Sequence, residues 1–186
     1  MKHQLIYFLL VISALSFAQK NNKPSYFGIK VGGNIATISG DFSEEYSSRF
    51  SFHIGMTGEL EISKTLQLVP EVLFSSVGAE NVVLNYITLP IGLRVYPDKN
   101  FYLEAGPQVG FSVGAVKEVG STQFGNDITN VNQTDFGANI GIGVKTDSRV
   151  LLGLRYYLGL SNLIQDQTYN NYNRVFQFSI AYLFKN

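Results

Sequence analysis

Cysteine is absent from the 186-residue chain, which excludes a small domain held together by disulfide bonds. The absence also excludes an exported lipoprotein, because such a protein carries a cysteine directly after its signal segment. No segment contains the ~20 consecutive apolar residues that a membrane-spanning helix needs. An exported chain would therefore have to fold without disulfide bonds, and it would have to cross a membrane without helices.

The charge pattern lacks a basic patch. Fourteen basic and fourteen acidic residues balance, so we expect no nucleic-acid partner. Outside the first 18 residues the only histidine is His53, and a metal site needs several clustered ligands. No glycine-rich phosphate-binding loop is present either. We therefore expect no metal and no cofactor.

The N-terminus has the organisation of a secretory signal peptide. Lys2 and His3 form a basic start, an apolar run of 11 residues follows at 5–15, and Ser16 and Ala18 supply small residues before a cleavage site. We expect residues 1–18 to be a signal peptide cleaved before Gln19, and residues 19–186 to form one domain. The alternative is a buried N-terminal helix.

Alternation of apolar and polar residues, the pattern of a half-buried strand, dominates the remaining chain. It predicts eight strands, at 26–37, 49–62, 66–76, 83–96, 101–116, 135–146, 150–160 and 174–184. The connections alternate between tight turns (63–65, 97–100, 147–149) and longer loops (39–48, 77–81, 117–134, 161–173). Short turns at one end and longer loops at the other are typical of outer-membrane barrels.

The two faces of these strands differ in a way that decides which one meets lipid. One face is bulky, aliphatic and free of charge, as in 49–62, where a charge at the bilayer midplane would cost about 2–4 kcal/mol. The other face carries long charged side chains and most of the glycines, which suits the narrow lumen of an eight-stranded barrel. We predict an all-β fold, an eight-stranded antiparallel up-and-down transmembrane β-barrel in the cell outer membrane, with lipid as partner. The alternative is a soluble barrel with the apolar face inside.

The inward-facing charges suggest an internal ion-pair network, because buried charges must be paired. Across the turn at 97–100, Arg94 faces Glu104 in one of two allowed registers. The predicted network is Lys30, Glu59, Glu61, Glu71, Arg94, Glu104, Lys145 and Arg155.

Aromatic residues gather near both ends of the apolar face, where a barrel has its interfacial girdles. The predicted girdles are Phe50, Phe52, Phe74, Phe136 and Phe176 toward the loops, and Phe27, Tyr182 and Phe184 toward the turns.

Catalysis finds little support. Glu59 and Glu61 lie ~7 Å apart on one strand face, but a glycosidase needs its carboxyl pair in an open cleft, which a filled lumen lacks. His53 lacks a recognisable serine and acid partner in the sequence. We expect no catalytic residue, and lipid modification remains an alternative.

Several motifs, in order, resemble the PorT-like outer-membrane β-barrel family of Bacteroidetes-type bacteria. They are GIKVGGN (28–34), LQLVPEVLFSSVGAE (66–80), LNYITLPIGLRVY (84–96), FYLEAGPQVGF (101–111), FGANIGIGVK (136–145) and LRYYLGLSNL (154–163). The resemblance implies an integral outer-membrane barrel. One family member is associated with protein secretion, but we do not extend that role to this chain. Lys185 and Asn186 follow Phe184, whereas some barrels end on the aromatic residue.

The loops are the expected place for specific function, because rigid scaffolds commonly present binding groups there. Loops 117–134 and 161–173 are rich in Asn, Gln, Thr and Tyr, and YNNYN (169–173) suits stacking on sugars or pairing with another surface protein. We therefore expect a structural or surface-interaction protein, with cell-surface or secretion proteins as partners. The alternatives are a purely protective cap, a small-solute pore, an accessory component of a secretion system, and a lipid-modifying enzyme.

Overall fold

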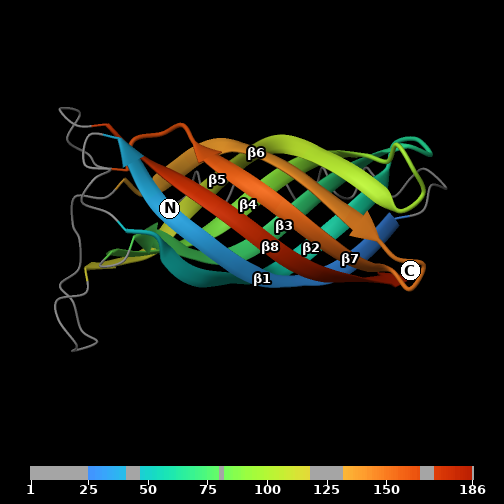
Figure 1. Cartoon of the computed structure of the whole chain (residues 1–186), viewed down its shortest axis with the longest axis horizontal. Helices are drawn as coiled ribbons and strands as arrows, with labels where there is room; N and C mark the ends of the chain where they lie inside the picture. Colours follow the sequence, from blue (N-terminus) through green and yellow to red (C-terminus); the bar gives the residue numbers. More distant parts are fainter. Residues whose placement is uncertain (1–24, 41–46, 80–81, 118–131, 164–169, 186) are drawn as a thin grey trace, which may run out of the picture.

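The computed structural model describes residues 25–40, 47–79, 82–117, 132–163 and 170–185, without the side chains of 115–117 and 185. The predicted signal peptide and most of the long loops lie outside these residues. The chain forms eight antiparallel strands, each paired with its neighbours in sequence, and β8 pairs with β1 to close a barrel (Figure 1). The predicted fold class is confirmed.

The strand bounds follow the alternating segments closely. They are β1 Ser25–Gly40, β2 Arg49–Glu61, β3 Leu66–Ala79, β4 Val82–Val95, β5 Phe101–Lys117, β6 Thr134–Lys145, β7 Val150–Gly159 and β8 Asn171–Lys185. The main differences are three-residue extensions of β1, β3 and β8 beyond their predicted bounds. β8 begins earlier because Asn171 and Asn173 still pair with Gly40 and Ile38 of β1. β3 continues to Ala79, so the loop predicted at 77–81 is mostly strand. No described segment is a helix long and apolar enough to cross a membrane.

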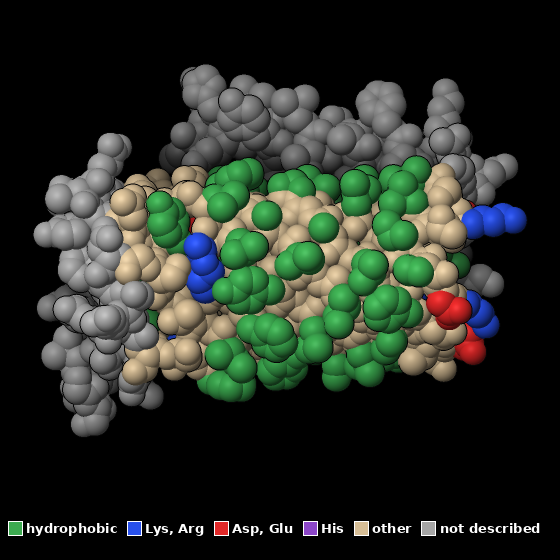
Figure 2. Space-filling model, turned by 45° about the horizontal axis from the view of Figure 1, so that its top comes forward, with side chains coloured by type: hydrophobic (Ala, Val, Ile, Leu, Met, Phe, Trp, Pro, Cys, Tyr) green, Lys and Arg blue, Asp and Glu red, His purple; other side chains and the backbone are tan. Residues whose placement is uncertain are grey.

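The outer wall of the barrel is apolar. Side chains such as Ile54, Met56 and Ile140 point away from the lumen and are 51%, 63% and 60% exposed. Figure 2 shows these side chains as a broad apolar band over the middle of the wall, with basic and acidic side chains at its margins. This is the outer surface that a barrel needs in lipid, so the apolar face of 49–62 points outward as predicted.

The interior contains two apolar clusters in addition to the expected charges. The turn-end cluster consists of Tyr96, Tyr102, Leu151, Ala181 and Leu183. The loop-end cluster consists of Ala36, Ile38, Val77, Ala79, Val82, Leu84, Tyr86, Tyr157, Leu163 and Val175. Neither cluster was predicted from the sequence, because the inward face was identified by its charged side chains and glycines alone.

Inward-facing glycines make room for large neighbours. A Cβ atom on Gly143 would lie 2.3 Å from the ring of Tyr102, and one on Gly32 would lie 2.5 Å from the imidazole of His53. Both distances are too short for a real contact, so any side chain there would displace Tyr102 or His53. The glycines of the lumen are therefore a packing requirement.

We predict that a charge in the middle of the outer wall destabilises the barrel. Ile54→Arg should lower the free energy of unfolding in lipid by about 2–4 kcal/mol, whereas the same change at the strand end, Ile62→Arg, should cost about 0–1 kcal/mol. Urea titration of the heat-modifiable band on gels measures both values. Equal costs at the two positions would contradict the assignment of this face to lipid.

Candidate functional site

Seven charged side chains form one continuous chain of ion pairs inside the barrel. We call it the ion-pair network, and its members in order are Lys30, Glu71, Arg155, Glu104, Arg94, Glu59 and Lys145. They come from β1, β2, β3, β4, β5, β6 and β7. The network therefore ties together almost the whole circumference of the barrel.

The first half of the network centres on Glu71. Lys30 Nζ lies 2.8 Å from Glu71 Oε1, and Arg155 Nη1 lies 2.7 Å from Glu71 Oε2. The Thr57 hydroxyl also donates to Glu71 over 3.3 Å. Arg155 uses its other terminal nitrogen to pair with Glu104. Arg155 thus bridges two carboxylates on strands that are not adjacent to its own.

The second half centres on Arg94 and Glu59. Arg94 Nη2 lies 2.5 Å from Glu104 Oε2, and its Nη1 lies 2.8 Å from Glu59 Oε1. Glu59 also pairs with Lys145 and accepts a 2.7 Å hydrogen bond from the hydroxyl of Tyr96. The guanidinium of Arg94 stacks over the ring of Tyr102, 4.2 Å from its centroid. Tyr96 and Tyr102 of the turn-end cluster thus cover this half of the network.

The network leaves no carboxylate available for other chemistry. Glu59, Glu71 and Glu104 each contact two cationic side chains and are 6% exposed or less. A buried acid held in this way cannot serve as a proton donor or nucleophile without breaking two ion pairs. The arrangement braces the lumen and closes it.

The structure unites all the residues of the predicted network except Glu61. Arg94 and Glu104 are direct register partners. The chain therefore adopts the one of the two allowed registers that places them opposite each other. Glu61 is half-buried at the turn end of β2 and makes none of the described ion pairs. The reach of Arg155 to two distant carboxylates was not predicted, because period-two alternation reports a face and not a neighbour across the lumen.

His53 is buried above the network, toward the loops. Its Nδ1 lies 2.7 Å from Asn34 Oδ1, and Gln177 Nε2 donates to the same oxygen over 3.0 Å. The described partner of the ring is therefore an amide and not a serine or an acid. Among the described residues there is also no cluster of three potential metal ligands.

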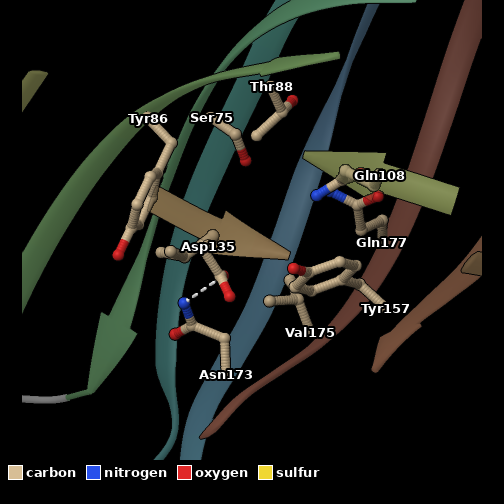
Figure 3. Close-up of a pocket in the computed structure, with 10 residues that line it drawn as sticks. Ser75, Tyr86, Thr88, Gln108, Asp135, Tyr157, Asn173, Val175 and Gln177 are labelled. Carbon is tan, nitrogen blue, oxygen red and sulfur yellow. Dashed lines mark hydrogen bonds between the residues drawn. The ribbon is translucent and has the colours of Figure 1, made fainter. Parts of the chain in front are cut away.

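A second polar site, drawn in Figure 3, was not predicted from the sequence. It lies on the loop side of His53, because its Asn173 pairs with Ile38 of β1, four residues beyond the Asn34 that contacts His53. We call it the polar cavity, and its walls are Ser75, Val77, Tyr86, Thr88, Gln108, Asp135, Tyr157, Asn173, Val175 and Gln177. The walls surround about 270 Å³, including space open to solvent, but only about 10 Å³ can hold the centre of a water-sized molecule. In the alternating pattern of β6 and β8, Asp135 and Asn173 fall on the inward face. This pattern was the feature of the sequence from which the site could have been predicted.

The eight predicted girdle residues all lie on the outer face. Phe50 is the most exposed of them at 70%. Phe52 packs beside Phe74 with ring centroids 5.8 Å apart, and Tyr182 meets Phe184 edge-on at 5.3 Å. Whether these rings act as interfacial anchors stays a prediction.

The loop residues that the structure describes are partly buried. Within 169–173, Asn171 and Asn173 are only 1% and 0% exposed, so their side chains do not offer themselves to an external partner. Leu163 donates its backbone N–H to Asn171 over 2.8 Å, which closes the base of this loop. The remaining residues of the predicted binding loops, 118–131 and 164–169, lie outside the described part.

Comparison with known proteins assigns the family. Residues 17–165 match the model of the outer membrane protein beta-barrel domain family. The chain belongs to this family. Its outer-membrane location follows, and the apolar wall shows how it is held there. No curated protein matches the sequence.

Solved structures of similar shape are also outer-membrane barrels. The attachment invasion locus protein Ail of Yersinia pestis is 12% identical, with a TM-score of 0.55 over 87% of this chain and 99% of Ail. The neisserial surface protein A is 13% identical, with a TM-score of 0.56 over 85% of this chain and 97% of that protein. Ail has also been solved with the heparin analogue sucrose octasulfate, at 12% identity, 87% and 99% coverage and a TM-score of 0.50. At these identities the likeness concerns the fold alone.

We predict that Glu104→Ala is strongly destabilising. The change leaves Arg94 and Arg155 without a shared carboxylate, and removing one partner of a buried ion pair costs about 3–5 kcal/mol. Glu61→Ala is the matched control and should cost about 0–1 kcal/mol, the usual value for a charge outside such a network. Chemical unfolding in detergent micelles measures both. If the two variants were equally stable, the network would not brace the barrel.

Proposed function

We propose that this outer-membrane barrel is a structural and surface-interaction protein whose loops form the binding surface. The observation that carries the proposal is the closed lumen. Charged pairs bridge it, and apolar clusters lie at both ends. With the interior filled and the wall in lipid, the loops are the part of the molecule that an external partner can reach.

A small-solute pore fits these observations poorly. The polar cavity and a second interior cavity, beside Lys30 and Glu71, each have room for the centre of about one water. A solute would have to break the pairs of Arg94 or Arg155 to pass. Each of those guanidiniums is held by two carboxylates.

We also propose that the protein is not an enzyme. The three network glutamates are each paired twice, and His53 is bonded to an amide. Lipid modification would need a base with an activated nucleophile beside it, and the described partners of His53 do not include one.

The composition of the loops favours a basic partner. The four segments predicted as loops, 39–48, 77–81, 117–134 and 161–173, contain seven acidic residues and one basic residue. Charge complementarity would steer cationic surfaces toward them and repel polyanions. The sulfated ligand of Ail therefore does not suit this chain, although the barrels share a fold.

We further propose that the chain is exported by a signal peptide at 1–18 and belongs to the PorT-like group of Bacteroidetes-type bacteria. The basic start, the apolar run and the order of the motifs support this. A cell-surface or secretion protein with a basic face is the kind of partner that the loop charge suits.

The loop proposal predicts selective binding of cations by the purified barrel. Protein immobilised in zwitterionic detergent should bind an oligolysine peptide, and heparin should not bind. Neutralising Asp41, Glu44 and Glu45 together (to Asn, Gln and Gln) should weaken the peptide binding by about tenfold at low salt, because three of the loop charges are lost. Surface plasmon resonance measures both ligands.

The control neutralises acids at the opposite end of the barrel. Asp98→Asn with Asp147→Asn changes two acidic residues in the tight turns and should leave oligolysine binding unchanged. Heparin binding, or equal losses in the two variants, would contradict the proposal that the loops select a basic partner.

A further inference from the structure

Asp135 is a buried acid without an ion pair among the described residues. The other buried acids of the described interior, Glu59, Glu71 and Glu104, are all paired with cations. Asp135 is only 4% exposed. Ser161 Oγ donates to its Oδ1 over 2.8 Å, and Asn173 Nδ2 donates to its Oδ2 over 2.7 Å. Both donors are neutral, and a carboxylate has about four acceptor positions. A negative charge with unused lone pairs therefore faces the polar cavity.

No basic side chain of the described residues pairs with this carboxylate. Arg174 is near enough for Asp135 to feel its charge, but its Nη1 donates to the backbone carbonyls of Gly159 and Asn173. The guanidinium lies on the outer face of β8, whereas Asp135 points inward. The cations of the ion-pair network are engaged with their own glutamates. An uncompensated buried carboxylate is costly, and it is relieved either by a proton or by a counter-cation inside the cavity.

Unpartnered oxygens surround the same space. Among the described residues, the hydroxyls of Tyr86 and Tyr157 and the amide oxygen Oδ1 of Asn173 are buried without a hydrogen bond of ordinary geometry. Tyr157 is near enough to interact with Asp135, and Tyr86 with Asn173, and all three residues line the cavity. Figure 3 shows Tyr157 and Asn173 beside the Asp135 carboxylate. Buried polar atoms nearly always have a partner. The lone pairs of these oxygens, gathered around one acid, suit a ligand that accepts electron pairs.

We propose that the polar cavity binds one monovalent cation of sodium or potassium size, held by the carboxylate of Asp135 and the neutral oxygens around it. Oxygen donors are the ligands that such hard cations prefer. The space for about one water-sized centre fits a single small ion and excludes an organic cation. A divalent ion would leave excess positive charge, because the described residues offer no second acid to the site.

A cation at this position joins four strands at the loop end of the barrel. Tyr86 comes from β4, Asp135 from β6, Tyr157 from β7 and Asn173 from β8. Ser161, which also holds Asp135, lies just after β7. The ion would thus fix the base of the connection between β7 and β8. This role is independent of what the loops bind.

The test measures the melting temperature of the folded barrel in zwitterionic micelles by circular dichroism. KCl or NaCl replaces choline chloride at constant total chloride, so that ionic strength does not change and choline is too large for the cavity. The melting temperature should rise by about 5 °C once the small cation exceeds its dissociation constant a hundredfold. Asp135→Asn should abolish the rise. The control Asp98→Asn, an acid in a tight turn, should retain it.

A second variant keeps the test decisive if Asp135→Asn does not fold. Tyr157→Phe removes one neutral oxygen and leaves the carboxylate in place, so about fivefold more KCl should be needed for the same rise. Three results would overturn the proposal. They are a wild-type melting temperature that does not depend on KCl or NaCl, an equal effect of choline, and an undiminished effect of KCl in Asp135→Asn. The first would mean that the cavity holds water only.

Discussion

The pairing of three buried glutamates with four cations is the interaction on which the rest of the structure depends. An eight-stranded barrel in lipid must satisfy its backbone by closing, and closure leaves a lumen that side chains must fill. Here the filling is ionic at its centre, where Arg94 and Arg155 each bridge two carboxylates. Charges buried there are stable only as a complete set, because any missing partner leaves a bare charge.

The layers above and below the network follow from that constraint. Apolar clusters cover the lumen at both ends, which keeps water from the ion pairs and strengthens them in the lower dielectric. On the loop side of the network, the polar cavity with Asp135 shares Val77, Tyr86, Tyr157 and Val175 with the loop-end cluster. The filled interior makes the barrel a closed support, and the binding of an external partner is proposed for the loops. Rigid scaffolds that carry binding residues on their loops are common among proteins.

Much of this could be predicted from the sequence because period-two alternation reports the face of each residue directly. The stretch 49–62 shows its lipid face without further information, and the tight turn at 97–100 limits the partner of Arg94 to a choice that includes Glu104. Contacts across the lumen could not be predicted in this way. Arg155 reaches Glu71 on β3 and Glu104 on β5, and nothing in the spacing of these residues indicates it. The polar cavity was missed for the same reason, since Tyr86, Asp135, Tyr157 and Asn173 meet only in the closed barrel.

Electrical recording from the purified barrel in a planar lipid bilayer tests whether the ion-pair network closes the lumen. We expect the wild-type protein, inserted and heat-modifiable, to give no sustained single-channel current in concentrated KCl. Steady channels of uniform conductance from the wild-type protein would contradict it. They would mean that ions pass the paired arginines and glutamates, and that the barrel is a pore.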